Sequence, residues 1–284
     1  RQQMEAAAVR LGTDMGYTSA GTVEFLVDDD TGDFFFLEVN TRLQVEHPVT
    51  EEARGIDLVR EQIQIANGSP ATPTEGASRS SIEVRLYAED PASNFLPATG
   101  TLTAFEVHPD DDAIRWDVGV EQGSAVTIDF DPMLGKVIAA GPSRTEAAQR
   151  LATALERLHI GGVVTNRDFL VNVLRSPAFL AGDTTTDFIE RIAPSPSVDL
   201  TDEDVDRAMI VASLWLRGRN RANDRHWGNL PAGFRTGRLP PTARTFTASA
   251  PFVEPGAAGA TRTVAYQPRR DGSVAIGVGS GRIV

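Results

Sequence analysis

The sequence predicts an α/β-plus-β chain, with helices and strands mixed over residues 1–192 and short strands after them. Three observations lead to this prediction. Several segments carry apolar residues at helical spacing, others alternate apolar with polar residues, and two linkers rich in Pro and Ser, 69–79 and 194–199, separate three blocks. A length of 284 residues is enough for about two domains, each with its own core.

The first block, residues 1–68, is predicted to hold two helices with a pair of strands between them. One helix covers about residues 1–15, and the other starts near Asp57 and stops at Asn67-Gly68, a usual capping pair. The strands are GTVEFLV (21–27) and FFFLEVN (34–40), joined by the turn-forming DDDTGD. The apolar stripes of the helices are Met4, Ala7, Ala8, Leu11 and Met15 in the first and Ile56, Val59, Ile63 and Ala66 in the second.

The second block, residues 80–192, is predicted to begin with strands and to continue with helices. In SIEVRLYAED the apolar residues alternate with Glu83, Arg85 and Tyr87, so this strand has one apolar and one polar face. Ser143 and Glu146 form a capping-box pattern ahead of an apolar stripe that ends at Leu158. Further strands are predicted near 100–108, 113–118, 124–130 and 136–140, and a further helix over 166–175.

The third block, residues 193–284, has a different composition. One amphipathic helix is predicted over 202–217, and residues 218–243 are rich in Arg, Gly and Pro. Short strands are predicted over 244–250, 261–267 and 273–278, the last two joined by a turn at Asp271-Gly272. The predicted domains are therefore 1–68, 80–192 and 198–284.

The composition excludes several classes of protein. The net charge of −12, from 27 basic and 39 acidic residues, gives no overall attraction to nucleic acid or to an anionic membrane. The chain has no cysteine, so disulfides and thiolate metal sites are excluded. No apolar run approaches the length that spans a bilayer, and no signal peptide opens the chain. We expect a cytoplasmic protein with neither nucleic acid nor membrane among its partners.

The predicted hairpin of residues 21–40 places polar side chains together. Pairing its strands so that opposed residue numbers sum to 62 gives one wholly apolar side, where Val23 faces Val39, Phe25 faces Leu37 and Val27 faces Phe35. On the other side Thr22 faces Asn40, Leu26 faces Phe36 and Glu24 faces Glu38. A slip of one residue would set apolar side chains against the polar face, so this register is preferred.

Opposed Glu24 and Glu38 should destabilise the sheet unless something joins them. A divalent cation would turn the repulsion into a binding site, to which Asn40 would add a carbonyl oxygen. Mg²⁺ and Mn²⁺ prefer such oxygen ligands and share them readily with phosphates. The alternative is a solvated polar face on which the two carboxylates splay apart. Spacing alone leaves both interpretations open.

The string FLEVNTRLQVEHPVTEEARGIDLVREQIQIANG closely resembles the biotin carboxylase signature in the ATP-grasp domain of biotin-dependent carboxylases. The strings IEVRLYAEDP, FLPATGTL, FDPMLGK and GVVTNRDFL resemble the carboxy-terminal α+β domain of the same enzymes. More weakly, the block with HWGNLPAGFR resembles a β-rich linking domain of propionyl-type enzymes. The resemblance implies the carboxy-terminal part of an ATP-grasp lobe, a biotin carboxylase carboxy-terminal domain and a partial linking domain, within the alpha subunit of an acyl-CoA carboxylase.

The same resemblance implies ATP-driven carboxylation of biotin by bicarbonate through carboxyphosphate. Glu24, Glu38 and Asn40 match the Mg²⁺ or Mn²⁺ ligands that hold the ATP phosphates. Arg42 matches the arginine that binds bicarbonate, and Gln44 and the Val45 backbone lie against the same anion. Glu46 matches the base that deprotonates bicarbonate, and Arg85 the residue that stabilises the enolate-like oxygen of biotin. The implied partners are a biotin carrier domain, a carboxyltransferase (beta) subunit and further copies of the chain in a homo-oligomer.

These residue types suit the chemistry. A carboxylate within hydrogen-bond reach can deprotonate bicarbonate, which is otherwise a weak nucleophile. Arginine stays charged and grips a planar oxyanion with two parallel hydrogen bonds, and a fixed cation stabilises oxygen charge that develops on biotin. Taken without the flanking motif, Arg42 or Arg85 would be interpreted as a member of a surface ion pair.

Other polar residues are assigned structural roles. His47 before Pro48 is expected to make a structural hydrogen bond, and Lys136, the chain's one lysine, to bury its stem among aliphatic neighbours. A cluster of arginines is better explained as a solvated helix end than as a contact with a partner subunit; its members are Arg217, Arg219, Arg221 and Arg225.

Parts that the resemblance requires are missing from the 284 residues. The glycine-rich ATP lid and the phosphate-gripping lysines would lie before Arg1, and no Ala-Met-Lys-Met segment for biotin attachment is present. We therefore expect a fragment that is inactive alone. Two rival interpretations are another ATP-grasp carbon–nitrogen ligase, which Arg85 within EVRLYAEDP argues against, and a non-catalytic dimerisation or subunit-docking module. The sequence names neither the acyl-CoA nor the oligomer.

Overall fold

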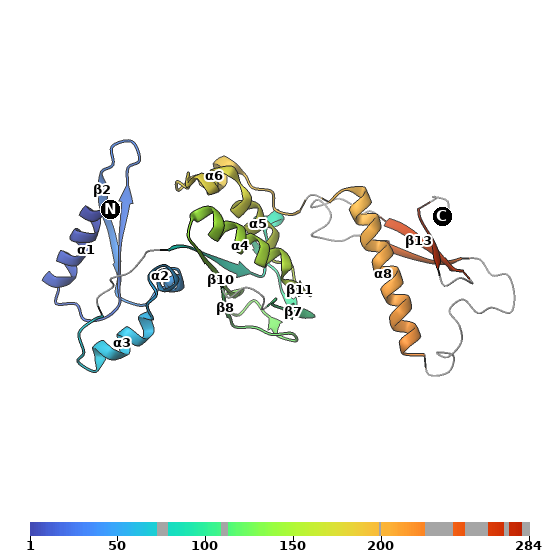
Figure 1. Ribbon diagram of the computed structural model, residues 1–284, viewed down its shortest axis with the longest axis horizontal. Coiled ribbons are helices and arrows are strands. Elements are labelled where there is room, and N and C mark those ends of the chain that lie inside the picture. Colours follow the sequence, from blue (N-terminus) through green and yellow to red (C-terminus); the bar gives the residue numbers. More distant parts are fainter. Residues whose placement is uncertain are drawn as a thin grey trace. The chain divides into compact units, whose positions relative to one another are not determined.

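The computed structural model describes residues 1–72, 79–108, 113–198, 200–224, 241–247, 261–269 and 273–279 (Figure 1). The chain forms two compact units, one of residues 1–88 and 97–194 and the other of residues 89–96 and 195–284. The predicted 1–68 segment and the 80–192 segment without residues 89–96 thus fall in one unit, while the domain boundaries themselves stay a prediction.

The amino-terminal part of the first unit contains α1 (Gln2–Asp14), β1 (Thr22–Val27), β2 (Phe34–Asn40), α2 (His47–Arg54) and α3 (Leu58–Ala66). The structure confirms both predicted helices, and the Asp57 side chain caps α3 by accepting from the Arg60 N–H at 2.8 Å. The apolar faces of these two helices are less buried than expected: Met15, which follows α1, and Val59 and Ile63 on α3 are exposed. Sequence reasoning missed α2, although Pro48 in its first turn and left-handed Gly55 after its end are ordinary start and stop signals.

The β1–β2 hairpin follows the predicted register only at its base. Thr22, Val23 and Glu24 face Asn40, Val39 and Glu38 as expected, but a β-bulge then shifts the pairing by one residue. Phe25 therefore faces Phe36, not Leu37, and Val27 faces Phe34, not Phe35. The prediction was wrong here because Phe34–Leu37 is uninterrupted apolar sequence, in which a slip moves no polar side chain. The shifted strands bring the rings of Phe25 and Phe34 edge to face, with centroids 5.4 Å apart.

The antiparallel sheet β3–β10–β8 is the centre of the first unit. It consists of β3 (Ser80–Tyr87), β10 (Met133–Gly141) and β8 (Ile114–Val118). Its apolar face packs against α4 (Arg144–Arg157) and α5 (Arg167–Arg175) in a core that includes Ile82, Val137 and Leu151. The Ser143 side chain caps α4 as predicted, by accepting from the Glu146 N–H. The other face carries Glu83, Arg85 and Lys136 and is contacted by α2.

The remaining elements of residues 79–194 are short. They are β4 (Glu89–Asp90), a 3₁₀ turn (Pro91–Ser93), β5 (Leu96–Pro97), β6 (Gly100–Thr101), β7 (Ala104–Glu106), β9 (Ala125–Val126), β11 (His159–Gly161), α6 (Pro177–Ala181) and α7 (Phe188–Ile192). The strand predicted over 100–108 is thus two strands, and that predicted over 124–130 is reduced to β9. Ile128 and Phe130, in the part of the predicted strand that follows β9, are both exposed, so this stretch has no buried face.

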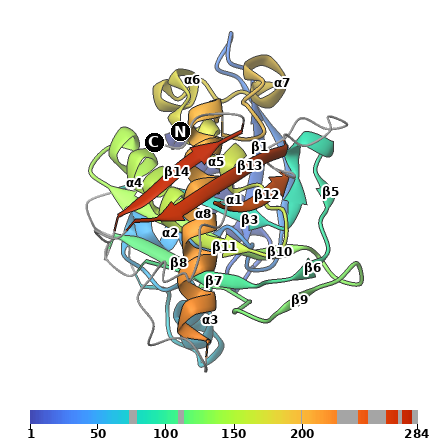
Figure 2. The same cartoon turned by 90° about the vertical axis from the view of Figure 1, so that its right-hand side faces the viewer.

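The second unit combines α8 (Asp202–Ala222) with the sheet β12–β13–β14. Its strands are β12 (Thr242–Thr247), β13 (Thr261–Pro268) and β14 (Val274–Val278), close to the predicted positions, and α8 is longer than expected. α8 contacts β13 and β14, as Figures 1 and 2 show. Within α8 the guanidinium of Arg219 lies 4.7 Å from the centroid of the Trp215 ring. Arg225, HWGNLPAGFR and the Asp271-Gly272 turn lie outside the described residues.

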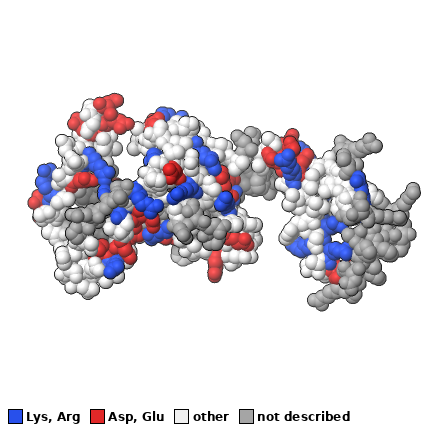
Figure 3. Space-filling model, viewed as in Figure 1, with Lys and Arg blue, Asp and Glu red and all other residues white. Residues whose placement is uncertain are grey.

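The described residues include no helix that is both long and apolar enough to cross a membrane. Acidic side chains gather at the tip of the β1–β2 hairpin, where Asp28, Asp29, Asp30 and Asp33 lie (Figure 3).

Candidate functional site

Two carboxylates converge at the base of the β1–β2 hairpin. Glu24 and Glu38 face each other across the strands, ahead of the bulge. The Asn40 amide joins them, because its Nδ2 donates to Glu24 Oε1 at 2.8 Å and to Glu38 Oε1 at 3.0 Å. Gln44 Nε2 also donates to Glu24 Oε1, at 2.9 Å. The carboxylates therefore do not splay apart but meet on the same amide.

This arrangement fits a hard divalent cation. The Asn40 NH₂ places its partial positive charge between two carboxylates, the position at which a cation would relieve the same repulsion. Turning the amide over would present its carbonyl oxygen together with oxygens from both carboxylates, which are ligands that Mg²⁺ and Mn²⁺ prefer. No group of three or more His, Asp or Glu suited to a metal ion occurs among the described residues. Two carboxylates and one amide thus form the donor set.

The segment after β2 presents an arginine without a carboxylate. Arg42 is exposed, and its Nη1 lies 3.5 Å from the carbonyl oxygen of neighbouring Leu43. It makes no ion pair with any side chain in the described part of the chain. Its charge and its donors other than the one directed at Leu43 are therefore available to an anion next to Gln44.

Arg85 and Glu46 form a short ion pair. Arg85 Nη2 donates to Glu46 Oε2 at 2.6 Å, although β3 and the segment before α2 are 39 residues apart in the sequence. Burial lowers the pKa of Arg85, but its interactions with Tyr87 and Glu46 outweigh burial, so the net shift is upward. The base and the cation implied by the resemblance thus lie in direct contact.

Lys136 holds the residue before Glu46. Its Nζ donates to the Val45 carbonyl oxygen at 2.9 Å and lies 3.5 Å from Asp117 Oδ2. Lys136 faces Arg85 across the β3–β10 ladder and Asp117 across the β10–β8 ladder. Two cations from adjacent strands therefore bind the consecutive residues Val45 and Glu46. The side chain of Lys136 is 13% exposed, in agreement with the predicted burial, but its contact is polar.

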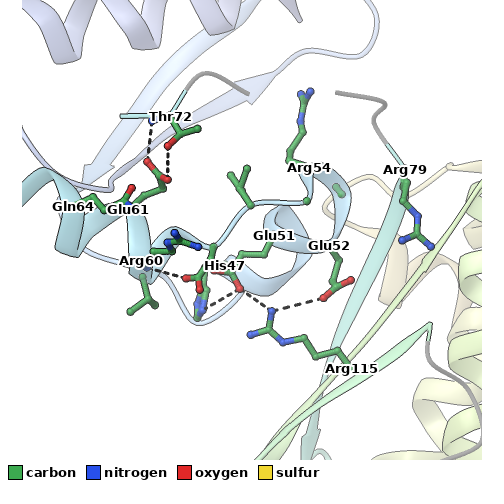
Figure 4. A pocket seen from close by; sticks show the side chains of 15 residues that line it. His47, Glu51, Glu52, Arg54, Arg60, Glu61, Gln64, Thr72, Arg79 and Arg115 are labelled. Carbon is green, nitrogen blue, oxygen red and sulfur yellow. Dashed lines mark hydrogen bonds and ion pairs between the residues drawn. The ribbon is translucent and has the colours of Figure 1, made fainter. Parts of the chain in front are cut away.

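A buried carboxylate anchors α2 to the sheet (Figure 4). Glu51, 7% exposed, accepts from the Leu58 N–H and from Arg115 Nη1, both at 2.7 Å. Arg115 also donates to both carboxylate oxygens of Asp117, at 2.8 and 3.0 Å. Burial raises the pKa of Asp117, but its interactions with Arg115 and Lys136 outweigh burial, so the net shift of this pKa is downward. His47 Nδ1 lies 2.8 Å from the Gln44 carbonyl oxygen, the structural hydrogen bond that was predicted.

The structure thus brings all the predicted site residues into one unit and adds others. Glu24, Glu38, Asn40 and Gln44 form one cluster, and Val45, Glu46 and Arg85 form a second with Lys136. Sequence reasoning assigned no role to Glu51, Arg115 and Asp117. Arg115 and Asp117 are two residues apart on a predicted strand, so the sequence could place them on one face of the sheet. Glu51 lies on α2, the helix that was missed, so nothing in the sequence indicated its contact with Arg115. Glu83 was placed on the polar face without a role.

Comparisons with known families identify two matched segments. Residues 83–191 match the family described as biotin carboxylase C-terminal domain. Residues 1–73 match the family described as carbamoyl-phosphate synthase L chain, ATP binding domain. The second match contains the hairpin, Arg42 and Glu46, and the first contains Arg85 and Lys136.

Curated relatives agree with these families. Biotin carboxylase 2 of Bacillus subtilis (strain 168) is 45% identical over 194 residues, which cover 67% of this chain and 43% of that protein. The propionyl-CoA carboxylase alpha chain of Ruegeria pomeroyi is 38% identical over 241 residues, covering 76% of this chain and 35% of that protein. The human mitochondrial propionyl-CoA carboxylase alpha chain is 43% identical over 198 residues, covering 68% and 27%. The chain spans less than half the length of these relatives.

Solved structures show the same likeness. The biotin carboxylase domain of a thermophilic 2-oxoglutarate carboxylase bound to bicarbonate has a TM-score of 0.64 and 37% identity, over 68% of this chain and 44% of that one. The dimeric biotin carboxylase domain of the Hydrogenobacter thermophilus enzyme, in complex with MgADP, ADP and bicarbonate, has a TM-score of 0.66 and 35% identity, over 70% and 44%.

Proposed function

Since this chain belongs to the biotin carboxylase family, we propose that its residues serve the ATP-dependent carboxylation of biotin by bicarbonate, through carboxyphosphate. The observation that carries the proposal is the contact between Arg85 and Glu46, which unites residues from the two matched families at 2.6 Å. A match to the carbamoyl-phosphate synthase type alone would suit other ATP-grasp ligases. The biotin carboxylase C-terminal match over residues 83–191 favours biotin as the acceptor.

Glu24, Glu38 and Asn40 would hold Mg²⁺ or Mn²⁺ with the phosphates of ATP. The bound ion would neutralise phosphate charge and orient the nucleotide. Gln44 connects this cluster to the start of α2, because its side-chain amide donates to Glu24 while its backbone carbonyl oxygen contacts His47. Residues 40–46 therefore hold the proposed metal ligands and the proposed bicarbonate-binding residues close to one another.

Bicarbonate would bind against Arg42, Gln44 and the Val45 backbone. Arg42 offers a planar cation with parallel donors and has no carboxylate partner among the described residues, so an oxyanion would not have to displace one. Lys136 fixes the Val45 carbonyl oxygen and thereby the backbone at this position. Glu46 would take the proton of bicarbonate, which strengthens the nucleophile that attacks the terminal phosphate.

Proton transfer to Glu46 has a consequence for Arg85. In the structure the two side chains are paired as ions. When Glu46 becomes neutral, the pair loses most of its Coulomb attraction, and the guanidinium becomes free to stabilise negative charge on the biotin oxygen. The base and the oxyanion stabiliser would thus act in order, because the first step releases the second residue.

The finer assignment is an alpha subunit of an acyl-CoA carboxylase in the cytoplasm. It is supported by the propionyl-CoA carboxylase relative, whose match of 241 residues extends beyond the 194 matched in Biotin carboxylase 2. Its partners would be a biotin carrier domain, a carboxyltransferase (beta) subunit and a second copy of the chain. The domains would be 1–68 of the ATP-grasp lobe, 80–192 of the biotin carboxylase carboxy-terminal domain and 198–284 of a linking domain.

An assay of the natural gene product that carries this sequence tests the function. We expect it to hydrolyse ATP only when both biotin and bicarbonate are present, and to fix labelled bicarbonate onto biotin. ATP hydrolysis that ignores biotin but responds to another amine would refute the biotin assignment. The 284 residues alone should be inactive, since they match only 43% of Biotin carboxylase 2.

A further inference from the structure

Glu83 is a buried carboxyl group for which the proposed mechanism has no use. It lies on β3 two residues before Arg85, and therefore on the same face of the sheet. Both of its carboxyl oxygens are buried, and neither has a hydrogen-bond partner in the described part of the chain. Its cross-strand neighbour Ile138 is fully buried, and α2 contacts both β3 and β10 on this side.

Charged and titratable groups of both signs lie on every element around Glu83. Arg85 is on its own strand, Lys136 is on β10, Asp117 and Arg115 are on β8, Glu46 precedes α2, and His47 and Glu51 lie on α2. Burial raises the pKa of Glu83 to about 7, Lys136 and Arg85 oppose that rise, and Glu46 and Asp117 add to it. Near neutral pH the group is therefore balanced between its protonated and its charged form.

Glu46 and Glu83 share the cations Arg85 and Lys136. Arg85 binds the Glu46 carboxylate directly, and Lys136 binds the adjacent Val45 carbonyl oxygen. Two interacting carboxyl groups titrate as a coupled pair, so neutralising one makes it easier to ionise the other. The charge state of Glu46 must consequently be felt at Glu83.

We propose that Glu83 is a positioning residue that carries the negative charge beside Arg85 and Lys136 when Glu46 is neutral. The proton of bicarbonate goes to Glu46, Glu83 releases its own proton to solvent, and both transfers reverse when Glu46 is deprotonated again. The net charge around the two cations stays constant through this exchange. A negative charge thus remains beside Arg85 while its guanidinium leaves Glu46.

This role of Glu83 rests on the proposed function in one respect, namely that bicarbonate supplies the proton that neutralises Glu46. The coupling itself is a property of the resting chain and needs no turnover. It is therefore tested without an activity assay, and its failure would leave the biotin carboxylase proposal intact.

The test is a titration of the 284-residue chain labelled with ¹³C at the glutamate carboxyl carbons. The Glu83 signal is identified by its absence from the Glu83→Gln variant. Its apparent pKa is then measured in the unmodified chain, in Glu46→Gln and in Glu52→Gln. Glu52 is a suitable control, because Glu52→Gln removes one negative charge from α2, close to Glu46, while Glu52 pairs with Arg115 and not with Arg85.

We expect the Glu83 signal to titrate near neutral pH in the unmodified chain and in Glu52→Gln. In Glu46→Gln its apparent pKa should fall by about half a unit to one unit, because a repelling charge is removed and Arg85 is released. A Glu83 that titrates in the usual carboxyl range would overturn the proposal. So would an apparent pKa that is the same in Glu46→Gln as in the unmodified chain.

Discussion

Replacing Glu51 with alanine should destabilise the first unit far more than the same change at adjacent Glu52. Glu51 is 7% exposed and accepts two hydrogen bonds of 2.7 Å, from Arg115 and from the Leu58 N–H. Removing it leaves two part-buried donors unpaired, a backbone N–H and part of a guanidinium, at a cost of up to about 1–3 kcal/mol each. Arg115 retains both hydrogen bonds to Asp117, so we expect a total loss of about 3 kcal/mol.

Glu52 is the matched control. It lies on the same helix and 3.8 Å from the same arginine, but it is 31% exposed. Its alanine variant should lose no more than about 0.5 kcal/mol, because partly exposed ion pairs contribute little. Urea denaturation followed by tryptophan fluorescence gives the free energy of unfolding, and Trp116 on β8 is a probe next to Arg115.

A local measurement distinguishes this mechanism from general damage. The Leu58 amide should exchange with solvent much faster in Glu51→Ala, because its acceptor is gone, while amides of α4 should change only with global stability. Equal losses of stability in the two variants, or a Leu58 amide that stays protected in Glu51→Ala, would refute this role of Glu51.

Glu38→Gln should weaken Mn²⁺ binding to the chain about tenfold or more, because a carboxylate ligand is lost. Electron paramagnetic resonance measures this affinity, and Asp29→Asn at the hairpin tip is the control. Equal Mn²⁺ affinities in Glu38→Gln and the unmodified chain would count against the metal site. Arg85→Ala in the complete enzyme should lower the rate of biotin carboxylation about 10²-fold and leave the affinity for ATP little changed. Arg85→Lys should recover only part of this rate, because the planar guanidinium is lost. An Arg85 variant with normal carboxylation and poor ATP binding would contradict the proposed role of Arg85 toward biotin. Glu83→Gln should stabilise the chain at pH 8 but not at pH 4. The folded pKa of about 7 lies above the usual 4.5, so wild-type stability falls as pH rises through this window. The shift corresponds to about 3.4 kcal/mol, which we reduce to about 1–2 kcal/mol because solvent reaches part of the side chain. Urea unfolding at both pH values checks this, and an equal effect at pH 4 would contradict it.

Local pattern predicted most of the elements and the base of the hairpin. The pairs Val23–Val39 and Glu24–Glu38 were predictable because apolar and polar residues alternate there on both strands. The register beyond them was not, since Phe34–Leu37 offers the same apolar surface on either face. The ends of the short strands likewise depend on their partners more than on their own residues.

The burial of charged groups could not be predicted in the same way. Alternation placed Glu83 and Arg85 on the polar face of a strand, a pattern that usually means contact with water. That face is instead contacted by α2, an eight-residue helix with little apolar surface of its own. Its position is set by non-local contacts, namely those of Glu51 with Arg115 and of Glu46 with Arg85. The raised pKa of Glu83 follows from that packing, so no local pattern in the sequence could indicate it.

Like charges oppose each other across two different strand ladders, and the same short segment resolves both conflicts. Glu24 faces Glu38 in the hairpin, and Arg85 faces Lys136 in the central sheet, arrangements that should each cost stability. Residues 40–46 run between them: the amides of Asn40 and Gln44 bind the acidic pair, whereas the Val45 carbonyl and the Glu46 carboxylate bind the basic pair. A cation at the first pair and an anion near the second would take over these same contacts. Residues 40–46, which stabilise the resting chain, are thus the segment that metal and bicarbonate would reorganise together, because Asn40 contacts the acidic pair and Val45 and Glu46 contact the basic pair.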